Sequence, residues 1–576
     1  MIKLLKFLRG SAVICAIIAP IMMCVEVIMD LQQPRFLANI IDIGIANGDN
    51  SYILVTGERM LLAAFIGLIG GAGCSIFASI AAMSMGEKLR QGIFDKIQTL
   101  SFLEIDRFNT SSLITRLTND VSQVQNMMLM AMRIMVRAPL MCIGGIVMAI
   151  SLSNKLSLVF LIAIPIIVAA VAIIITKSFP LFISVQQKLD KINTVMRENI
   201  LGMRVIKAFT IKDRQLEKFG EGNYELMEKS IQAQNVNMLL WPIVNLVMNL
   251  SVIAVLWFGG KMVYQDTIEI GKIMAFINYL LQIMNSLIMV VNVVINFSRA
   301  KASADRINEV LDAQASVKDS SKAEHMKGFD IEFRNVCFRY NAQSDYVLKD
   351  ICFKAAAGEK IGIIGATGSG KSSLVSLIPR LYDVNEGQIL IGGTDVRKLW
   401  LKELRDNIGI VLQESIIFSG NIEENIKFGN PAANSELIEK SAADAQALEF
   451  INLKEHKYKS IIEQRGKNLS GGQKQRLSIA RTLIRNPRIL ILDDSSSALD
   501  MATEARLQQA IRNTMKDSTV IIIAQRISGV MDCDKIIVLD DGMISSIGTH
   551  KQLLLENEIY RSIAISQLGE EVLTNV

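Results

Sequence analysis

Histidine and charged residues are scarce in this chain of 576 residues. Only 20% of the residues are charged and 51% are hydrophobic, which is too apolar for an ordinary soluble protein. The three histidines are His325, His456 and His550, and the seven cysteines are scattered without the spacing of metal ligands. We therefore expect free thiols, no disulfide framework and no zinc site. The net charge of +5 calls for no nucleic-acid partner.

Long hydrophobic runs are confined to the first half of the chain. Six charge-free runs occur there, at residues 10–25, 60–86, 138–154, 156–176, 231–260 and 273–298. A bilayer core needs about 20 helical residues, so these runs predict six spanning helices. Lysine and arginine gather in the long loops after the second and fourth runs, whereas the opposite loops are short and poor in basic residues. Both long loops and both termini should therefore be cytoplasmic.

The second half of the chain contains a glycine-rich motif of the kind that binds phosphates. Residues 365–372, Gly-Ala-Thr-Gly-Ser-Gly-Lys-Ser, fit G-x-x-x-x-G-K-S, and they lie between an apolar strand at 361–364 and a helical pattern that runs to Pro379. In such a loop the backbone N–H groups surround phosphates, Lys371 reaches the terminal phosphates and Ser372 can bind Mg²⁺. Asp493 ends another apolar strand, where a carboxylate can hold the Mg²⁺ shell. We therefore predict a site for ATP and Mg²⁺.

The pattern of elements predicts how the chain is divided. Short β-type runs such as 360–364 and 489–492 alternate with helical patterns, which is typical of an α/β domain with a mostly parallel sheet. We expect a six-helix transmembrane domain with long cytoplasmic extensions at 1–311, a linker at 312–328 and a nucleotide-binding domain at 329–576.

Further motifs follow in a characteristic order. They are Tyr340 upstream of the glycine-rich loop, then Gln413, Leu-Ser-Gly-Gly-Gln at 469–473, Asp493-Asp494, Ser-Ala-Leu-Asp at 497–500 and Gln525. This series resembles the ATP-binding cassette (ABC) family, and six spans followed by one cassette resemble a half-size exporter of the type IV class. The likeness covers the whole chain. It implies a multi-pass protein of the plasma (inner) membrane with a cytoplasmic cassette.

The resemblance also implies a role for each motif. Tyr340 would stack on adenine, a contact worth on the order of 1 kcal/mol, and Gln413 would join the Mg²⁺ ligands Ser372 and Asp493 and link them to the membrane helices. Ser470, Gly471, Gly472 and Gln473 would contact ATP bound to the other cassette of a head-to-tail dimer. The remaining ATP contacts would come from Gly365, Thr367, Gly368, Ser369, Gly370, Lys371 and Ser373.

Two positions depart from the family pattern. Asp494 stands where a catalytic glutamate is expected, and its carboxylate falls short by one C–C bond, about 1.5 Å. A misplacement of ~1 Å can cost ~10²-fold in rate. Gln525 stands where a histidine senses the γ-phosphate, and it can donate a hydrogen bond but cannot become cationic. This pattern resembles the degenerate subunit of a heterodimeric exporter whose partner keeps the glutamate and histidine; tolerated drift with near-normal hydrolysis is the alternative.

Polar residues in the predicted spans suggest a transport path. In the sixth span, Asn278, Gln282, Asn285, Asn292 and Asn296 fall on one stripe, which faces either a neighbouring helix or a water-filled cavity. Arg133 and Arg137 could attract anionic compounds or extend to the membrane interface. Glu26 and Asp30 could form a gate or lie at the interface.

The predicted function is ATP-driven export of hydrophobic or amphipathic molecules, of the multidrug type. A lipid or lipopeptide flippase and a non-transporting ATP-binding regulator are the alternatives. By the same resemblance, the loops at 102–120 and 197–209 would couple the cassette to the membrane helices.

Overall fold

The structure, a computed structural model, describes residues 1–320, 322–341 and 343–569; the side chains of residues 2, 291, 292, 294 and 295 lie outside the description. The chain forms two compact units. Unit 1 comprises Met1–Lys96 and Ser111–Asp312, and unit 2 comprises Ile97–Thr110 and Ala313–Val576. Residues 97–110, which join two helices of unit 1 in sequence, thus belong to unit 2 by their contacts.

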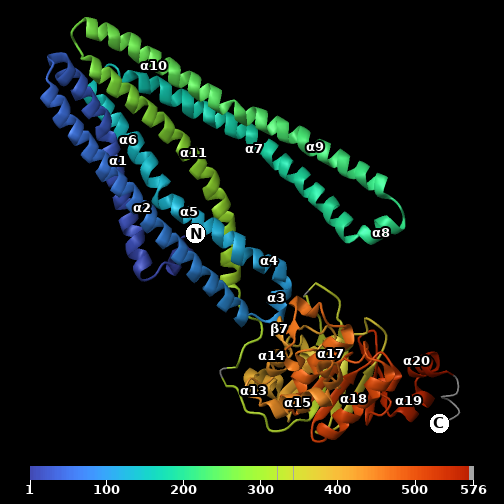
Figure 1. The fold of residues 1–576 in the computed structure, drawn as a ribbon. Coiled ribbons are helices and arrows are strands. Elements are labelled where there is room, and N and C mark those ends of the chain that lie inside the picture. Colours follow the sequence, from blue (N-terminus) through green and yellow to red (C-terminus); the bar gives the residue numbers. More distant parts are fainter. Residues whose placement is uncertain (321, 342, 570–576) are drawn as a thin grey trace. The chain divides into compact units, whose positions relative to one another are not determined.

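Unit 1 is helical throughout its described part (Figure 1). Its elements are η1 (Ile2–Phe7), α1 (Ser11–Asn39), η2 (Ile40–Ile45), α2 (Asn50–Thr99), α4 (Thr110–Thr115), η3 (Arg116–Asp120), α5 (Val121–Met132), α6 (Ile134–Leu152), α7 (Leu158–Leu201), α8 (Met203–Ala208), α9 (Lys212–Met238), α10 (Leu240–Tyr264) and α11 (Ile270–Asp312). Six helical stretches are long and apolar enough to cross a membrane: Ser11–Ile45, Asn50–Thr99, Thr110–Leu152, Leu158–Leu201, Lys212–Tyr264 and Ile270–Val290. The six predicted spans are therefore confirmed, and several helices continue well beyond the length of a bilayer core.

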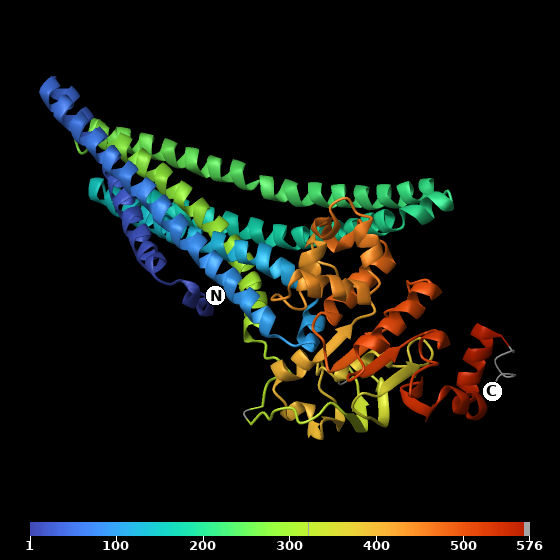
Figure 2. The same ribbon diagram turned by 60° about the horizontal axis from the view of Figure 1, so that its bottom comes forward.

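Close packing in unit 1 depends on small residues. A Cβ added to Gly70 of α2 would lie 2.9 Å from the backbone nitrogen of Glu26 in α1, so glycine is what permits the two helices to approach. Phe160 of α7 stacks on Phe276 of α11 with ring centroids 5.0 Å apart. Helices α7 and α9 form a long hairpin whose turn, α8, lies away from α1 and α2 in both views (Figures 1 and 2).

Unit 2 is built around a six-stranded sheet in the order β12-β11-β3-β10-β9-β6. Its strands are β3 (Lys360–Ile364), β6 (Ile408–Val411), β9 (Ile489–Asp493), β10 (Thr519–Ile523), β11 (Lys535–Asp540) and β12 (Met543–Gly548), and only β12 runs antiparallel to its neighbour. Every residue of β9 is buried, as expected for a parallel strand covered on both faces. The predicted fold class, a helical membrane domain followed by an α/β cassette, is confirmed.

Smaller sheets and helices complete unit 2. Strands β1 (Ile331–Phe338), β2 (Leu348–Ala355), β4 (Glu386–Ile391) and β5 (Thr394–Asp395) form an antiparallel sheet, and β7 (Gly420–Asn421) pairs with β8 (Ile461–Ile462). The α-helices are α3 (Phe102–Phe108), α12 (Lys371–Leu377), α13 (Leu401–Asn407), α14 (Ile422–Lys427), α15 (Ser435–Asp444), α16 (Leu448–Asn452), α17 (Gly471–Leu483), α18 (Met501–Thr514), α19 (His550–Glu556) and α20 (Glu558–Leu568). Short 3-10 turns are η4 (Val396–Lys398), η5 (Lys457–Lys459), η6 (Gln464–Gly466) and η7 (Ile527–Gly529). The carboxyl ends of the parallel strands β3, β9 and β10 lie together, which is where ligands bind in open α/β sheets.

Candidate functional site

The glycine-rich loop connects β3 to α12. Gly368 and Gly370 have φ angles of +88° and +95°, in the left-handed region that favours glycine. A Cβ on Gly365 would lie 2.1 Å from the carbonyl oxygen of Leu539, so a larger residue cannot fit there. The glycines of the motif are therefore required by backbone conformation and by close packing, and they leave the loop open at the N-terminus of α12.

Lys371 lies over this loop. Its ammonium donates hydrogen bonds to the carbonyl oxygens of Gly365 at 2.8 Å and Ala366 at 2.7 Å. Burial lowers the pKa of Lys371, while the nearby carboxylates of Asp494 and Asp493 act in the opposite direction. The side chain is thus held where the phosphates of a nucleotide would enter the loop.

Ser372 and Asp493 meet at the base of the same pocket. The Ser372 hydroxyl donates a hydrogen bond of 3.0 Å to Oδ1 of Asp493. Burial raises the pKa of Asp493 above its usual value, so a cation beside this carboxylate would stabilise its ionised form. A hydroxyl and a carboxylate at this separation, next to a phosphate loop, are the oxygen ligands that Mg²⁺ prefers, so the residues present fit Mg²⁺.

The two altered positions contact each other. Nε2 of Gln525 donates a hydrogen bond of 2.8 Å to Oδ2 of Asp494. The parallel pairing of β9 with β10 brings them together, because Asp493 lies opposite Ile523, Asp494 is the first residue after β9 and Gln525 is the second after β10. Burial raises the pKa of Asp494, and the bond from Gln525 opposes that rise. Asp494 therefore offers a carboxylate that already has a partner within its own chain.

The structure gathers most of the predicted nucleotide contacts in one pocket. Its lining includes Thr367, Gly368, Gly370, Lys371, Ser372, Ser373, Gln413, Asp493, Asp494 and Gln525. Tyr340 lies beside this pocket, with its hydroxyl 2.9 Å from Oγ of Ser373. Gly471 lines a different hollow, which it shares with Gln413 and Ser497. Gln413 is thus the one predicted residue that borders both pockets within the described part of the chain.

The motif at 469–473 forms the start of α17. Ser470 is the N-cap residue, its hydroxyl accepts from the backbone N–H of Gln473, and the Gln473 side chain accepts from the backbone N–H of Ser470. This reciprocal capping fixes the loop at the helix N-terminus and leaves Gly471 and Gly472 at its first positions.

Sequence reasoning missed Gln475, one turn further into α17. Its side chain is buried, its Nε2 lies 3.4 Å from both the carbonyl oxygen of Asp494 and Oγ of Ser497, and its Oε1 accepts from the backbone N–H of Ala498 at 3.2 Å. Gln475 therefore ties α17 to the turn that follows Asp494. A glutamine on an amphipathic helix gives no such signal in the sequence.

Three predicted polar residues of the membrane unit form one ion cluster. The guanidinium of Arg137 in α6 pairs with the carboxylate of Glu26 and, at 2.9 Å, with that of Asp30, both in α1. The guanidinium of Arg137 is therefore held between α6 and α1, and its extension to the membrane interface stays a prediction. Charged groups in such places are costly unless they are paired, and here each nitrogen of the fork has its own carboxylate.

The polar stripe of α11 has mixed surroundings. Asn278 donates to the carbonyl oxygen of Met274 in its own helix, Asn285 is exposed, and Oε1 of Gln282 is buried without a hydrogen-bond partner among the described residues. The side chain of Asn292 lies outside the description. Both interpretations of the stripe, contact with a neighbouring helix and a water-filled cavity, stay predictions.

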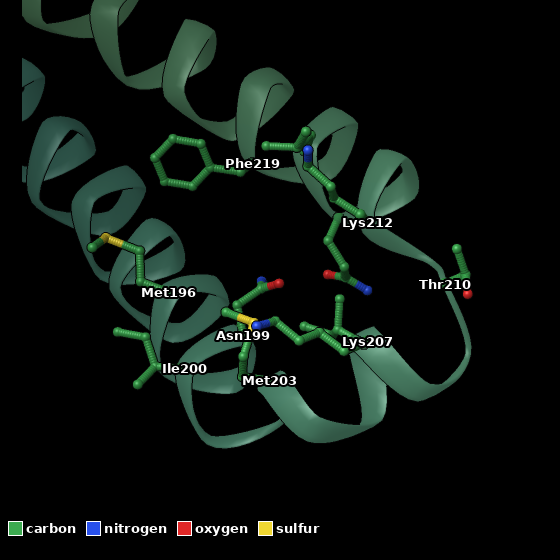
Figure 3. A pocket seen from close by; sticks show the side chains of 11 residues that line it. Met196, Asn199, Ile200, Met203, Lys207, Thr210, Lys212 and Phe219 are labelled. Atoms are coloured by element: carbon green, nitrogen blue, oxygen red, sulfur yellow. The ribbon is translucent and has the colours of Figure 1, made fainter.

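Both predicted coupling loops are helical, at α3 and α8. The elbow that contains α8 encloses an apolar pocket of about 690 Å³ (Figure 3). Met196 and Ile200 of α7, Met203 of α8 and Phe219 of α9 line it (Figure 3).

Comparison with known proteins gives two family matches. The model of the ABC transporter transmembrane region matches residues 16–287, and the ABC transporter model matches residues 348–497.

Relatives resemble the chain along most of its length. The uncharacterized ABC transporter ATP-binding protein YfiB of Bacillus subtilis (strain 168) is 41% identical over 99% of both chains. A second Bacillus subtilis protein, YgaD, named provisionally as a multidrug export ATP-binding/permease protein, is 34% identical over 84% of both chains. The solved structure of a bacterial Atm1-family ABC exporter with ATP bound has a TM-score of 0.81 at 24% identity and covers 98% of this chain and 100% of its own. At that identity the likeness to the Atm1-family exporter concerns the fold.

Proposed function

Because this chain belongs to the ABC transporters, as a multi-pass membrane protein with an ATPase cassette, we propose that it is the degenerate subunit of a heterodimeric exporter. Its partner is a second half-transporter with glutamate and histidine at the positions of Asp494 and Gln525. This chain binds ATP and Mg²⁺ and releases them slowly, while the partner's site carries out hydrolysis and drives export.

The observation that carries this proposal is the hydrogen bond from Gln525 to Asp494. A general base must accept a proton from the attacking water, and losing such a base costs ~10²–10⁴-fold in rate. Here the carboxylate that would act is short by one methylene group and already accepts a hydrogen bond from the residue that would contact the γ-phosphate. The Ser372–Asp493 pair and Lys371, which serve binding, keep the geometry described above.

The site residues act in two groups under this proposal. Lys371 and the N–H groups of the glycine-rich loop bind the phosphates, Ser372, Asp493 and Gln413 hold Mg²⁺, and Tyr340 stacks on adenine. Ser470, Gly471, Gly472 and Gln473 serve the ATP held by the partner, in keeping with a place outside the chain's own phosphate pocket. Mg²⁺ neutralises charge on the phosphates when it is bound.

A second polypeptide is supported by the α7–α9 hairpin. Ile200, Leu201 and Phe209 near its turn are 68%, 81% and 73% exposed, and Ile200 also lines the apolar pocket of Figure 3. Soluble surfaces rarely leave large apolar patches uncovered, and these residues lie far along the helices beyond a membrane-spanning length. We assign this surface to contact with the partner's cassette.

A hydrophobic or amphipathic substrate of the multidrug type is supported by α11 and by one relative. Asn285 and Met289 are exposed on α11, and an adaptable surface with few fixed charges suits loose recognition. YgaD, whose name mentions multidrug export, is 34% identical to this chain.

Affinity purification of the tagged chain from its native membrane tests the proposal. We expect a second six-span cassette protein, with glutamate and histidine at the two positions, to copurify in equal amount. The reconstituted pair should hydrolyse ATP, and Ser470→Ala together with Gly471→Asp in this chain should abolish most of that activity although the partner's own Walker residues are untouched. Recovery of a homodimer with brisk ATPase activity, or a pair whose rate ignores the loss of Ser470 and Gly471, contradicts the proposal.

A further inference from the structure

A continuous group of aromatic side chains leads from Tyr340 to α3. The rings of Tyr340 and Tyr382 meet edge to face, with centroids 5.2 Å apart and an interplanar angle of 88°. Phe338 packs against both, at 4.8 Å from Tyr340 and 5.7 Å from Tyr382. On its far side Tyr382 contacts Phe102 of α3, with centroids 6.2 Å apart. The Tyr340–Tyr382 and Phe338–Tyr340 pairs are edge to face and the two other pairs are tilted by 52°, and packed rings of this kind hold a defined relative orientation.

Hydrogen bonds fix both ends of this group. The Tyr340 hydroxyl lies 2.9 Å from Oγ of Ser373, next to the Mg²⁺ ligand Ser372. The Tyr382 hydroxyl donates to Oδ2 of Asp106 in α3 at 2.7 Å. Burial, followed by the bond to Asp106, raises the pKa of Tyr382 well above its usual value, so the phenol keeps its proton at any physiological pH.

Helix α3 joins two helices of unit 1 in sequence, so a displacement of α3 acts directly on both of those helices. The segment 97–110 belongs to unit 2 by its contacts, yet it is bonded directly to α2 on one side and α4 on the other. Its other anchor is separate from the aromatic group: Oγ of Ser101 accepts from the backbone N–H of Val317 at 3.0 Å. Tyr382 is thus the described side chain that touches both the α3 segment and the residue proposed to stack on adenine.

We propose that Tyr382 is a positioning residue that makes the docking of α3 depend on a purine base at Tyr340. The step rests on the proposed function, in which Tyr340 binds adenine. A base stacked on one face of Tyr340 restricts rotation of its ring. The restricted ring keeps its edge-to-face contact with Tyr382, and Tyr382 then keeps its hydrogen bond to Asp106. The triphosphate alone, bound only by the glycine-rich loop, leaves the exposed face of Tyr340 without a stacked base and does not tighten α3.

Amide exchange of the segment 97–110 tests this step in the purified complex in lipid nanodiscs. In the unaltered protein, a non-hydrolysable ATP analogue with Mg²⁺ should protect this segment, and inorganic tripolyphosphate with Mg²⁺ should not. Tyr382→Phe keeps the ring and removes the phenol, so we expect nucleotide affinity to stay within about twofold while the nucleotide-dependent protection of 97–110 falls by about tenfold or more, the range for one hydrogen bond to a charged group. Asp106→Asn should reproduce the loss in part.

Tyr346→Phe is the matched control. Tyr346 also donates its phenol to a carboxylate, Oε1 of Glu386 at 2.6 Å, but it lies outside the contacts that reach α3. This variant should keep full protection of 97–110. Unchanged protection in Tyr382→Phe, or equal protection by tripolyphosphate, overturns the role of Tyr382 while leaving ATP binding intact. Failure of the nucleotide to bind, or an affinity that Tyr340→Ala leaves unchanged, refutes instead the nucleotide contact on which the step depends.

Discussion

Restoring both altered residues, Asp494→Glu and Gln525→His, is expected to convert the site that we propose to be slow into a hydrolytic one. The added methylene group moves the carboxylate outward by about 1.5 Å, and the imidazole replaces the amide that now holds Oδ2 of Asp494. A positioned base is worth ~10²–10⁴-fold. In the chain purified alone, where each site of a self-paired dimer carries Asp494, the ATPase rate should rise by that factor.

The single variant Asp494→Glu separates the effect of carboxylate length from the effect of the Gln525 hydrogen bond. Asp494→Glu alone leaves the Gln525 amide, which bonds the carboxylate at 2.8 Å in the present structure. That bond, worth about 1.5–3 kcal/mol when one partner is charged, competes with the catalytic position, so we expect a gain smaller than that of the pair of changes. Because the residues are in contact, their effects should be non-additive by about 0.5–3 kcal/mol in a double-mutant cycle.

The assay is steady-state phosphate release at saturating MgATP, with nucleotide affinity measured in parallel. Asp494→Asn serves as the control: it should leave the slow rate nearly unchanged, because Asp494 contributes little to turnover in this account. A doubly restored chain that binds MgATP normally but hydrolyses it within about threefold of the unaltered rate contradicts the slow-site proposal. Loss of a brisk rate in Asp494→Asn contradicts it as well.

Other expected outcomes concern the phosphate loop, the ion cluster and the hairpin. Gly370→Ala should weaken nucleotide binding at least tenfold in a fluorescent-nucleotide titration, because its Cβ would lie 3.0 Å from the backbone carbonyl oxygen of Val347 as well as 2.8 Å from Cδ2 of Leu348. Gly368→Ala meets open space, so it should carry only the left-handed backbone cost of about 1–2 kcal/mol that both positions share. Equal effects of the two variants would contradict a role for close packing at Gly370. Arg137→Leu should destabilise the purified complex by about 1–3 kcal/mol, less than for a fully buried pair because the arginine is partly exposed. Adding Glu26→Gln to Arg137→Leu should recover part of the lost melting temperature. An unaltered melting temperature in Arg137→Leu alone would argue against a stabilising role of the cluster. Phe209→Asp should reduce recovery of the partner in affinity purification, while Tyr264→Asp, at an exposed position outside the hairpin turn, should not.

Local patterns predicted the phosphate loop well because its chemistry lies within eight consecutive residues. The glycines at 365, 368 and 370 each answer a requirement that short sequence motifs encode, either a left-handed φ or close packing. The six spans were equally predictable, since composition over about 20 residues decides membrane insertion.

Side-chain pairing across long separations could not be predicted. The bond between Tyr382 and Asp106 joins residues 276 positions apart; the resemblance predicted a coupling loop at 102–120, but the local pattern does not indicate this pairing. Arg137 looked like a residue near a membrane interface because its sequence neighbours are apolar; its two carboxylates lie on another helix. In each case the partner is fixed by tertiary packing rather than by local spacing.

A slow site and a base-dependent contact to α3 fit together in one physical argument. The aromatic group begins at Tyr340, the residue proposed to stack on adenine, whereas Asp494 and Gln525 line the pocket of the glycine-rich loop. If both proposals hold, docking of α3 in this chain follows occupancy and not hydrolysis. If MgATP stays bound here through several cycles of the partner, α3 stays held for the same time, and this half of the transporter acts as the steadier support against which the hydrolysing half moves. The two halves then differ in how long each cassette keeps its own coupling helix docked. Amide exchange rates of residues 97–110, measured during turnover, would report this time directly.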